Sequence, residues 1–141
     1  MITVHPYIYF NGNCEEAFKF YASVFRSKIS SINKYKDVPK SERNMFQESD
    51  DKILHATLSL GKETKLNGAD NSSAYGDMIK SKTFSLIIHT DSKEEVDRLC
   101  HELSTDGKVV VPANFTFWGS YYGECIDRFG ISWKVTFVSE N

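Results

Sequence analysis

The chain of 141 residues contains a weak internal repeat, and this repeat limits the folds that it can adopt. Residues 13–17 correspond to residues 92–96, which lie 79 positions further along. Each segment begins with a capping box, a pattern in which the first side chain and a glutamate satisfy free N–H groups at a helix start. The two boxes are Asn13-x-x-Glu16 and Ser92-x-x-Glu95. Apolar residues then recur at helical spacing, so the repeat predicts two amphipathic helices in equivalent places.

Strand-like runs surround both predicted helices, one before each helix and three after it. The predicted strands are 6–10, 29–36, 53–60 and 64–67 in the first half and 83–89, 109–111, 121–126 and 131–138 in the second. We therefore expect an α+β fold in which two βαβββ modules form one curved mixed sheet with the helices outside. It is expected as a single domain, with module one at 1–66, a linker at 67–82 and module two at 83–141. The polar segment 36–52 is predicted to be a long loop, either a lid, a dimer arm or a solvated excursion.

Alternation along the predicted strands separates an apolar set of side chains from a polar set. The apolar set, such as Ile8 with Phe10 and Trp133 with Val135, is expected to face the helices. The polar set is expected to share the opposite face and to line a ligand cup. Its members are His5, Tyr7, Tyr9, His55, Thr57, Ser59, Ser85 and Lys134. A solvated sheet face explains the same pattern equally well.

Composition excludes several functional classes. The net charge of −2 and the sequence pI near 6.1 leave no basic surface for nucleic acid. No apolar run approaches the length of a membrane span, and no basic leader precedes the first strand. The three cysteines are widely spaced and lack a C-x-x-C pair, which favours reduced thiols and a cytoplasmic location. The commonest adenosylmethionine fold needs a parallel sheet with a glycine-rich first turn, and neither is predicted.

Two motifs near the ends of the chain carry a family resemblance. Residues 6–17 with Phe20-Tyr21 form the first, and Phe117-Trp118-Gly119, Tyr122-Gly123, Asp127-Arg128-Phe129-Gly130 and Trp133 form the second. Together they resemble the PhnB-like branch of the vicinal oxygen chelate superfamily, which also contains glyoxalase I, extradiol dioxygenases and bleomycin-resistance proteins. The resemblance implies the paired βαβββ architecture and a homodimer. Asp127-x-x-Gly130 also reads as a tight hairpin between two strands.

The resemblance also implies positions for a divalent metal, which enzymes of this superfamily usually hold with histidines and carboxylates. These positions fall on His5, on its repeat partner Ser85, near His55, and on Lys134 where the family has a glutamate. A lysine about 4 Å from a cation opposes it by roughly 4 kcal/mol per unit charge, so no metal cofactor is expected. Glu124 is the available substitute, but it shares the strand parity of Ile126 and is expected to face the other way. A metal, if bound, would use His5, His55 and Glu124.

Three functions follow as hypotheses. The first is a small-molecule-binding PhnB-like protein of unassigned activity, which uses Lys134 for charge, Tyr7 and Tyr9 for stacking and two histidines for hydrogen bonds. Trp118 is a further candidate contact, because it lies next to a glycine in Phe117-Trp118-Gly119 and could reach the ligand cup or a dimer contact. The second hypothesis is a metal-dependent lyase, isomerase or dioxygenase, and the third is a non-catalytic dimeric scaffold. No catalytic residue is predicted.

Overall fold

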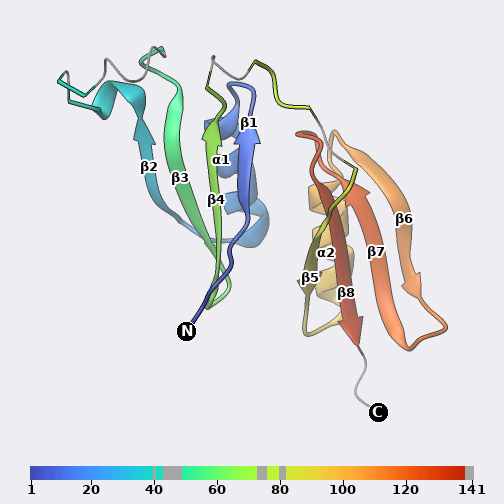
Figure 1. Cartoon of the computed structure of the whole chain (residues 1–141). Coiled ribbons are helices and arrows are strands. Elements are labelled where there is room, and N and C mark those ends of the chain that lie inside the picture. Colours follow the sequence, from blue (N-terminus) through green and yellow to red (C-terminus); the bar gives the residue numbers. More distant parts are fainter. Residues whose placement is uncertain (40, 43–48, 73–75, 80–81, 139–141) are drawn as a thin grey trace. The chain divides into compact units, whose positions relative to one another are not determined.

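The computed structural model describes residues 1–39, 41–42, 49–72, 76–79 and 82–138. The chain forms two compact units, Met1–Ile79 and Lys80–Asn141. Each unit contains one α-helix and one four-stranded sheet, as Figure 1 shows. Residues 40 and 43–48 of the predicted loop at 36–52 lie outside the described residues, and its described part includes the end of a short 3-10 helix at Tyr35–Asp37 and the turn before the next strand.

The elements of the two units follow the same order along the chain. The N-terminal unit contains β1 (Tyr7–Phe10), α1 (Cys14–Phe25), β2 (Ile29–Lys34), β3 (Ile53–Leu60) and β4 (Thr64–Asp70). The C-terminal unit contains β5 (Leu86–His89), α2 (Lys93–Leu103), β6 (Lys108–Phe115), β7 (Ser120–Ile126) and β8 (Ser132–Val138). The strand orders are β1-β4-β3-β2 and β5-β8-β7-β6. In both sheets the first strand pairs in parallel with the last, and the remaining pairs are antiparallel.

These observations confirm the α+β class and the repeated βαβββ modules. Among the described residues, the strands pair only within their own unit, so the hydrogen-bonded sheets number two. Several strand ends differ from the prediction by one to four residues; for example, β5 begins at Leu86 and not at residue 83. β4 continues through Gly68 to Asp70, into the segment predicted as linker, and β6 continues through Pro112 to Phe115. Pro112 is tolerated because β6 is an edge strand, where a missing N–H costs no ladder hydrogen bond.

The apolar side chains of each unit are buried between its sheet and its helix. In the N-terminal unit Phe18 and Tyr21 of α1 are fully buried, as are Leu58 and Leu66 of the sheet. Ile53 is buried while Leu54 is only partly so, because a register shift in β2 between Asn33 and Lys34 reverses the expected alternation there. The core of the C-terminal unit is built in the same way from α2 and the sheet: Val96, Leu99, Leu103, Trp133 and Val135.

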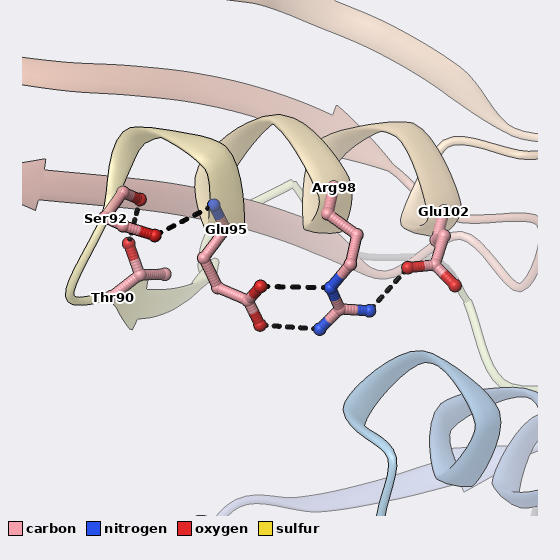
Figure 2. A network of polar contacts seen from close by, with 5 residues as sticks. All are labelled: Thr90, Ser92, Glu95, Arg98 and Glu102. Carbon is pink, nitrogen blue, oxygen red and sulfur yellow. Dashed lines mark hydrogen bonds and ion pairs between the residues drawn. The ribbon is translucent and has the colours of Figure 1, made fainter.

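The two helices begin differently, although their sequences predict the same capping box. Ser92 caps α2 as predicted: its hydroxyl accepts a hydrogen bond from Glu95 N at 3.2 Å (Figure 2). The Glu95 carboxylate binds the guanidinium of Arg98, and Arg98 also binds Glu102, which raises the pKa of Arg98. The predicted cap at Asn13 is wrong, because the Asn13 side chain makes no capping hydrogen bond. The buried carboxylate of Asp70, at the end of β4, accepts the hydrogen bond from Cys14 N instead.

The predicted hairpin at Asp127–Gly130 is confirmed. Gly130 adopts φ of 88°, a left-handed conformation that glycine accepts without strain, and its N–H donates to Asp127 O at 2.9 Å. The buried Asp127 carboxylate accepts hydrogen bonds from Phe129 N, Ile131 N and the indole Nε1 of Trp133, at 2.9, 3.0 and 2.9 Å. This hairpin fixes the register between β7 and β8, and with it the side-chain pairs on their faces.

Candidate functional site

The first candidate surface is the outward face of the N-terminal sheet, the face turned away from α1. Alternation in β1 places Ile8 and Phe10 in the core, whereas Tyr7 and Tyr9 are 44% and 53% exposed. The strand register aligns Tyr7 with Asn67 of β4, and Asn67 with Thr57 of β3. Strand alternation therefore puts these polar and aromatic side chains on one face, as predicted for Tyr7, Tyr9 and Thr57.

Three aromatic rings gather on this face. The ring centroids of Tyr7 and Tyr9 lie 5.1 Å apart, and those of Tyr7 and His55 lie 5.8 Å apart. Burial raises the pKa of the Tyr7 hydroxyl, so this tyrosine is a neutral hydrogen-bonding group at physiological pH. The predicted residues Tyr7, Tyr9 and His55 thus form one ring cluster, which offers aromatic surface beside an imidazole.

Polar side chains adjoin the ring cluster. The Thr57 hydroxyl donates to Asn67 Oδ1 at 2.9 Å, and Asn67 Nδ2 donates to Pro6 O at 3.4 Å. His5, which precedes β1, accepts a hydrogen bond at Nδ1 from Lys65 N at 3.1 Å. One of its two ring nitrogens is therefore engaged by backbone, and only Nε2 remains for a ligand.

The second candidate surface is the outward face of the C-terminal sheet, where Lys134 lies directly opposite Glu124 on neighbouring antiparallel strands. Lys134 Nζ is 2.5 Å from Glu124 Oε1 and 2.9 Å from the hydroxyl of Tyr122, which itself donates to Glu124 Oε1. The ion pair with Lys134 lowers the pKa of Glu124, and the same contact raises the pKa of Lys134. The expectation that Glu124 faces away from Lys134 is wrong. It assumed that Ile126 faces the helix, whereas Ile126 shares the outward face.

Two other predicted residues belong to the C-terminal unit. The indole of Trp118, in the turn between β6 and β7, is 60% exposed and packs edge-on against the Tyr122 ring at 6.0 Å. Trp118 therefore contacts the tyrosine that hydrogen-bonds to both members of the Lys134–Glu124 pair. The Ser85 hydroxyl, immediately before β5, lies 2.7 Å from the Ser132 hydroxyl in a mutual hydrogen bond.

The donors of the predicted metal set fit a divalent cation poorly. Lys134 occupies the position of the family glutamate and binds Glu124, so an approaching cation would have to displace an ammonium from the Glu124 carboxylate. His5 has one ring nitrogen engaged by Lys65 N. Within the described part of the chain, no three or more His, Cys, Asp or Glu side chains are grouped so that they could hold a metal.

The cysteines of the chain are free thiols. Burial raises the pKa of Cys125 to about 12 and that of Cys100 to about 11, and burial also raises the pKa of Cys14. A thiol with such a pKa is almost wholly protonated at neutral pH, and a protonated thiol is a poor nucleophile. Cys125 therefore acts as a small buried side chain.

Sequence reasoning missed Asn67 as a participant in these surfaces, and it also missed Tyr122 and placed Glu124 on the wrong face. The signal for the last two was present in the hairpin. A tight turn at 127–130 pairs Ile126 with Ser132 across the two strands. Two residues further from the turn on each strand, Glu124 is therefore paired with Lys134. Asn67 was missed because no faces were assigned to the predicted strand 64–67, which ended at that residue.

Comparison with known proteins identifies the family. The family model described as 3-demethylubiquinone-9 3-methyltransferase matches residues 2–136. Protein YjdN of Escherichia coli (strain K12) is 25% identical over 143 residues, which cover 96% of this chain and 95% of that protein. The crystal structure of protein PA1353 from Pseudomonas aeruginosa superposes with a TM-score of 0.86 at 33% identity, covering 99% of this chain and 100% of the other.

Two further structures bear on the fold. The PhnB protein from Bacillus cereus has a TM-score of 0.79 at 26% identity, covering 97% of this chain and 100% of the other. A glyoxalase/bleomycin resistance protein/dioxygenase family enzyme from Burkholderia phytofirmans PsJN has a TM-score of 0.66 at 15% identity, covering 96% and 97% of the two chains, and so shows a shared fold. Neither helix in the described part of the chain is long and apolar enough to cross a membrane. The chain belongs to the 3-demethylubiquinone-9 3-methyltransferase family, is similar to the PhnB protein, and has the fold of glyoxalase/bleomycin resistance/dioxygenase proteins.

Proposed function

We propose that this protein binds a small polar organic molecule that carries a planar or ring-shaped part, and that the ligand contacts the outward face of the N-terminal sheet. The ring cluster of Tyr7, Tyr9 and His55 is the observation that carries the proposal. Tyrosine side chains that are about half exposed on a rigid strand offer apolar area with little entropy left to lose on binding.

The polar groups beside the rings supply orientation. One row across the sheet consists of Tyr7, Asn67, Thr57 and Ser31, each directly opposite the next. All four side chains are neutral and carry hydrogen-bonding atoms, so they suit hydroxyl, carbonyl or amide groups of a ligand. A mixture of apolar ring surface and a few convergent polar atoms is typical of small-molecule sites.

Ligand-observed saturation-transfer NMR with a library of planar polar fragments tests the proposal. Tyr7→Leu and Tyr9→Leu together remove both rings while keeping apolar side chains on the strand, and the signals of fragments bound at these rings are expected to disappear. Phe84→Leu is the matched control, because Phe84 is equally exposed at 54% but belongs to the C-terminal unit. Fragment binding that the double variant leaves unchanged would contradict the proposal.

Methyl transfer, which the family description names, is not part of this proposal. The common adenosylmethionine-binding fold is a doubly wound parallel sheet with a glycine-rich turn. Each sheet here is mixed, with one parallel pair and two antiparallel pairs. The proposal of ligand binding is therefore based on the side chains of this protein and not on the description of its family.

We also propose that the protein forms a homodimer and resides in the cytoplasm. The exposed apolar side chains of the edge strand β6 and its turn support self-association, since Val110, Phe115 and Phe117 are 44%, 65% and 98% exposed. The free thiols support a reducing location. Light scattering is expected to give twice the 16.1 kDa of one chain, and Phe115→Ser with Phe117→Ser is expected to give the single-chain mass.

A further inference from the structure

We infer that the Lys134–Glu124 pair recognises a neutral amide edge, that is, adjacent carbonyl and N–H groups as in a lactam or a pyrimidine-like ring. This inference goes beyond the proposed function, because it concerns a second surface, on the C-terminal unit, and names the ligand chemistry that this surface selects. The relevant residues are Trp118, Tyr122, Glu124 and Lys134, which we call the paired-charge cluster.

The paired-charge cluster holds its two charges close together. Lys134 Nζ lies 2.5 Å from Glu124 Oε1, and the Tyr122 hydroxyl hydrogen-bonds to both. At distances much larger than their separation, the two opposite unit charges largely cancel. An anionic ligand would therefore meet no net attraction, and it would have to separate Lys134 from a carboxylate that repels it.

Each member of the pair keeps one hydrogen-bonding position without a partner in the described part of the chain. Lys134 has three N–H donors, of which one reaches Glu124 and one reaches Tyr122. Glu124 accepts both of its hydrogen bonds at Oε1, which leaves Oε2 as an acceptor. The side chains of Lys134 and Glu124 are 37% and 23% exposed, so a ligand can reach them.

One donor beside one acceptor is the complement of an amide edge. The carbonyl oxygen of a lactam would accept from Lys134 while its N–H donates to Glu124 Oε2. Both hydrogen bonds involve an ionised protein group, and such charge-assisted bonds are stronger than neutral ones. A ligand without the N–H would leave the Glu124 position unsatisfied, which is the kind of loss that gives a site its selectivity.

Aromatic and apolar side chains border the pair. The Trp118 indole stands edge-on to the Tyr122 ring at 6.0 Å, and the Lys134 ammonium lies 5.6 Å from the centre of that ring. On the other side, β5 places Ile87, which is 52% exposed, directly opposite Lys134. A planar ring bound at the amide edge would thus have apolar surface on both sides.

The chain contains two tryptophans, which makes the test direct. In a ¹H–¹⁵N spectrum, the indole signal of the exposed Trp118 reports the paired-charge cluster. Trp133 is buried and hydrogen-bonded to Asp127, so its signal serves as an internal reference and as a check of folding. Titration with 2-pyridone is expected to shift the Trp118 signal and leave Trp133 unmoved. N-methyl-2-pyridone, which lacks the N–H, is expected to bind about ten-fold more weakly, and benzoate is expected to bind no better than the N-methyl compound.

Two variants separate the members of the pair. Lys134→Met is expected to abolish the 2-pyridone shift, and Glu124→Gln is expected to make benzoate the preferred probe because it leaves Lys134 as a net positive charge. Lys93→Met, which removes a lysine from the exposed ion pair with Asp97, is the matched control and is expected to change neither the 2-pyridone shift nor the preference between the probes.

Equal binding of 2-pyridone and its N-methyl derivative, stronger binding of benzoate to the wild type, or an unmoved Trp118 signal would overturn the inference. Any of these results, together with fragments that still bind at Tyr7 and Tyr9, would leave the proposed function standing.

Discussion

Asp70 and Cys14, which lie 56 residues apart, meet at the start of α1, where Asp70 Oδ1 accepts the hydrogen bond of Cys14 N at 2.9 Å. The second oxygen of the same carboxylate accepts from Ile53 N at 2.8 Å. One buried side chain at the end of β4 thereby stabilises the start of a helix and the start of β3. Its negative charge also lies at the helix N-terminus, where the helix dipole favours it.

Replacement of Asp70 is therefore expected to be costly. Asp70→Ala leaves two buried N–H groups without their acceptor, which is expected to lower the free energy of unfolding by about 2 to 5 kcal/mol. Asn13→Ala is the matched control, because Asn13 occupies the cap position but makes no capping hydrogen bond, and it is expected to change stability by only about 0.5 kcal/mol. Urea unfolding monitored by circular dichroism measures both. Equal losses in the two variants would contradict this assignment.

Unlike α1, which does not depend on the side chain at its cap position, α2 is expected to lose stability when its cap residue Ser92 is replaced. Ser92→Ala removes the acceptor of Glu95 N, which is expected to cost about 0.5 to 2 kcal/mol of unfolding free energy. Ser23→Ala, on the exposed side of α1, replaces serine by a better helix former and is expected to be neutral or slightly stabilising. The same urea titrations give the comparison, and a neutral Ser92→Ala would rule out a role for its hydroxyl.

The hairpin between β7 and β8 is expected to depend on one carboxylate. Asp127→Ala removes the acceptor of two backbone N–H groups and of the Trp133 indole, and is expected to cost about 3 to 5 kcal/mol. The Trp133 indole resonance should also move, since its hydrogen bond is lost. Glu63→Ala, in the turn between β3 and β4, is an exposed control that is expected to change neither stability nor the indole signal. An unchanged indole signal in Asp127→Ala would contradict the predicted hydrogen bond.

Acid is expected to remove the contribution of the Lys134–Glu124 pair to stability. The folded-state pKa of Glu124 is lowered, so its contribution is present above the ordinary carboxyl pKa of about 4.3 and is lost as the pH falls through the lower folded value. Because both side chains are partly exposed, the pair is expected to contribute no more than about 1 kcal/mol. Thermal unfolding of the wild type and of Glu124→Gln is expected to differ at neutral pH and to converge in acid. A difference that grows as the pH falls would contradict the sign of the shift.

The local parts of the fold could be predicted from the sequence, and the parts set by distant contacts could not. The cap at Ser92 and the turn at Asp127–Gly130 depend on residues within a few positions of one another, and both predictions were confirmed. The start of α1 depends on Asp70, whose distance along the chain hides it from any local pattern. The extension of β6 through Pro112 depends on its place at the sheet edge, which local sequence does not reveal.

The same distinction between local features and distant contacts applies to the candidate site. Alternation in β1 was sufficient to place Tyr7 and Tyr9 on an exposed face. The pairing of Glu124 with Lys134 required the register of two strands, and an apolar residue at Ile126 suggested the wrong face. An isoleucine can lie on the outward face because folded proteins expose much apolar surface, so parity judged from a single apolar residue is weak evidence.

The parallel pairing of β1 with β4 also affects the order in which the N-terminal unit can be completed during synthesis. Among the strands that the structure describes, β1 lies at the edge of its sheet and pairs with β4 alone, and Tyr7 pairs with Asn67, 60 residues further along the chain. At the usual rate of translation, about 3 to 12 seconds separate the emergence of these two partners. β2, β3 and β4 are joined as an antiparallel meander and need no contact with β1 to pair. The strand that carries both tyrosines of the ring cluster is therefore the first to be synthesised and cannot be paired until the last strand of its unit has emerged.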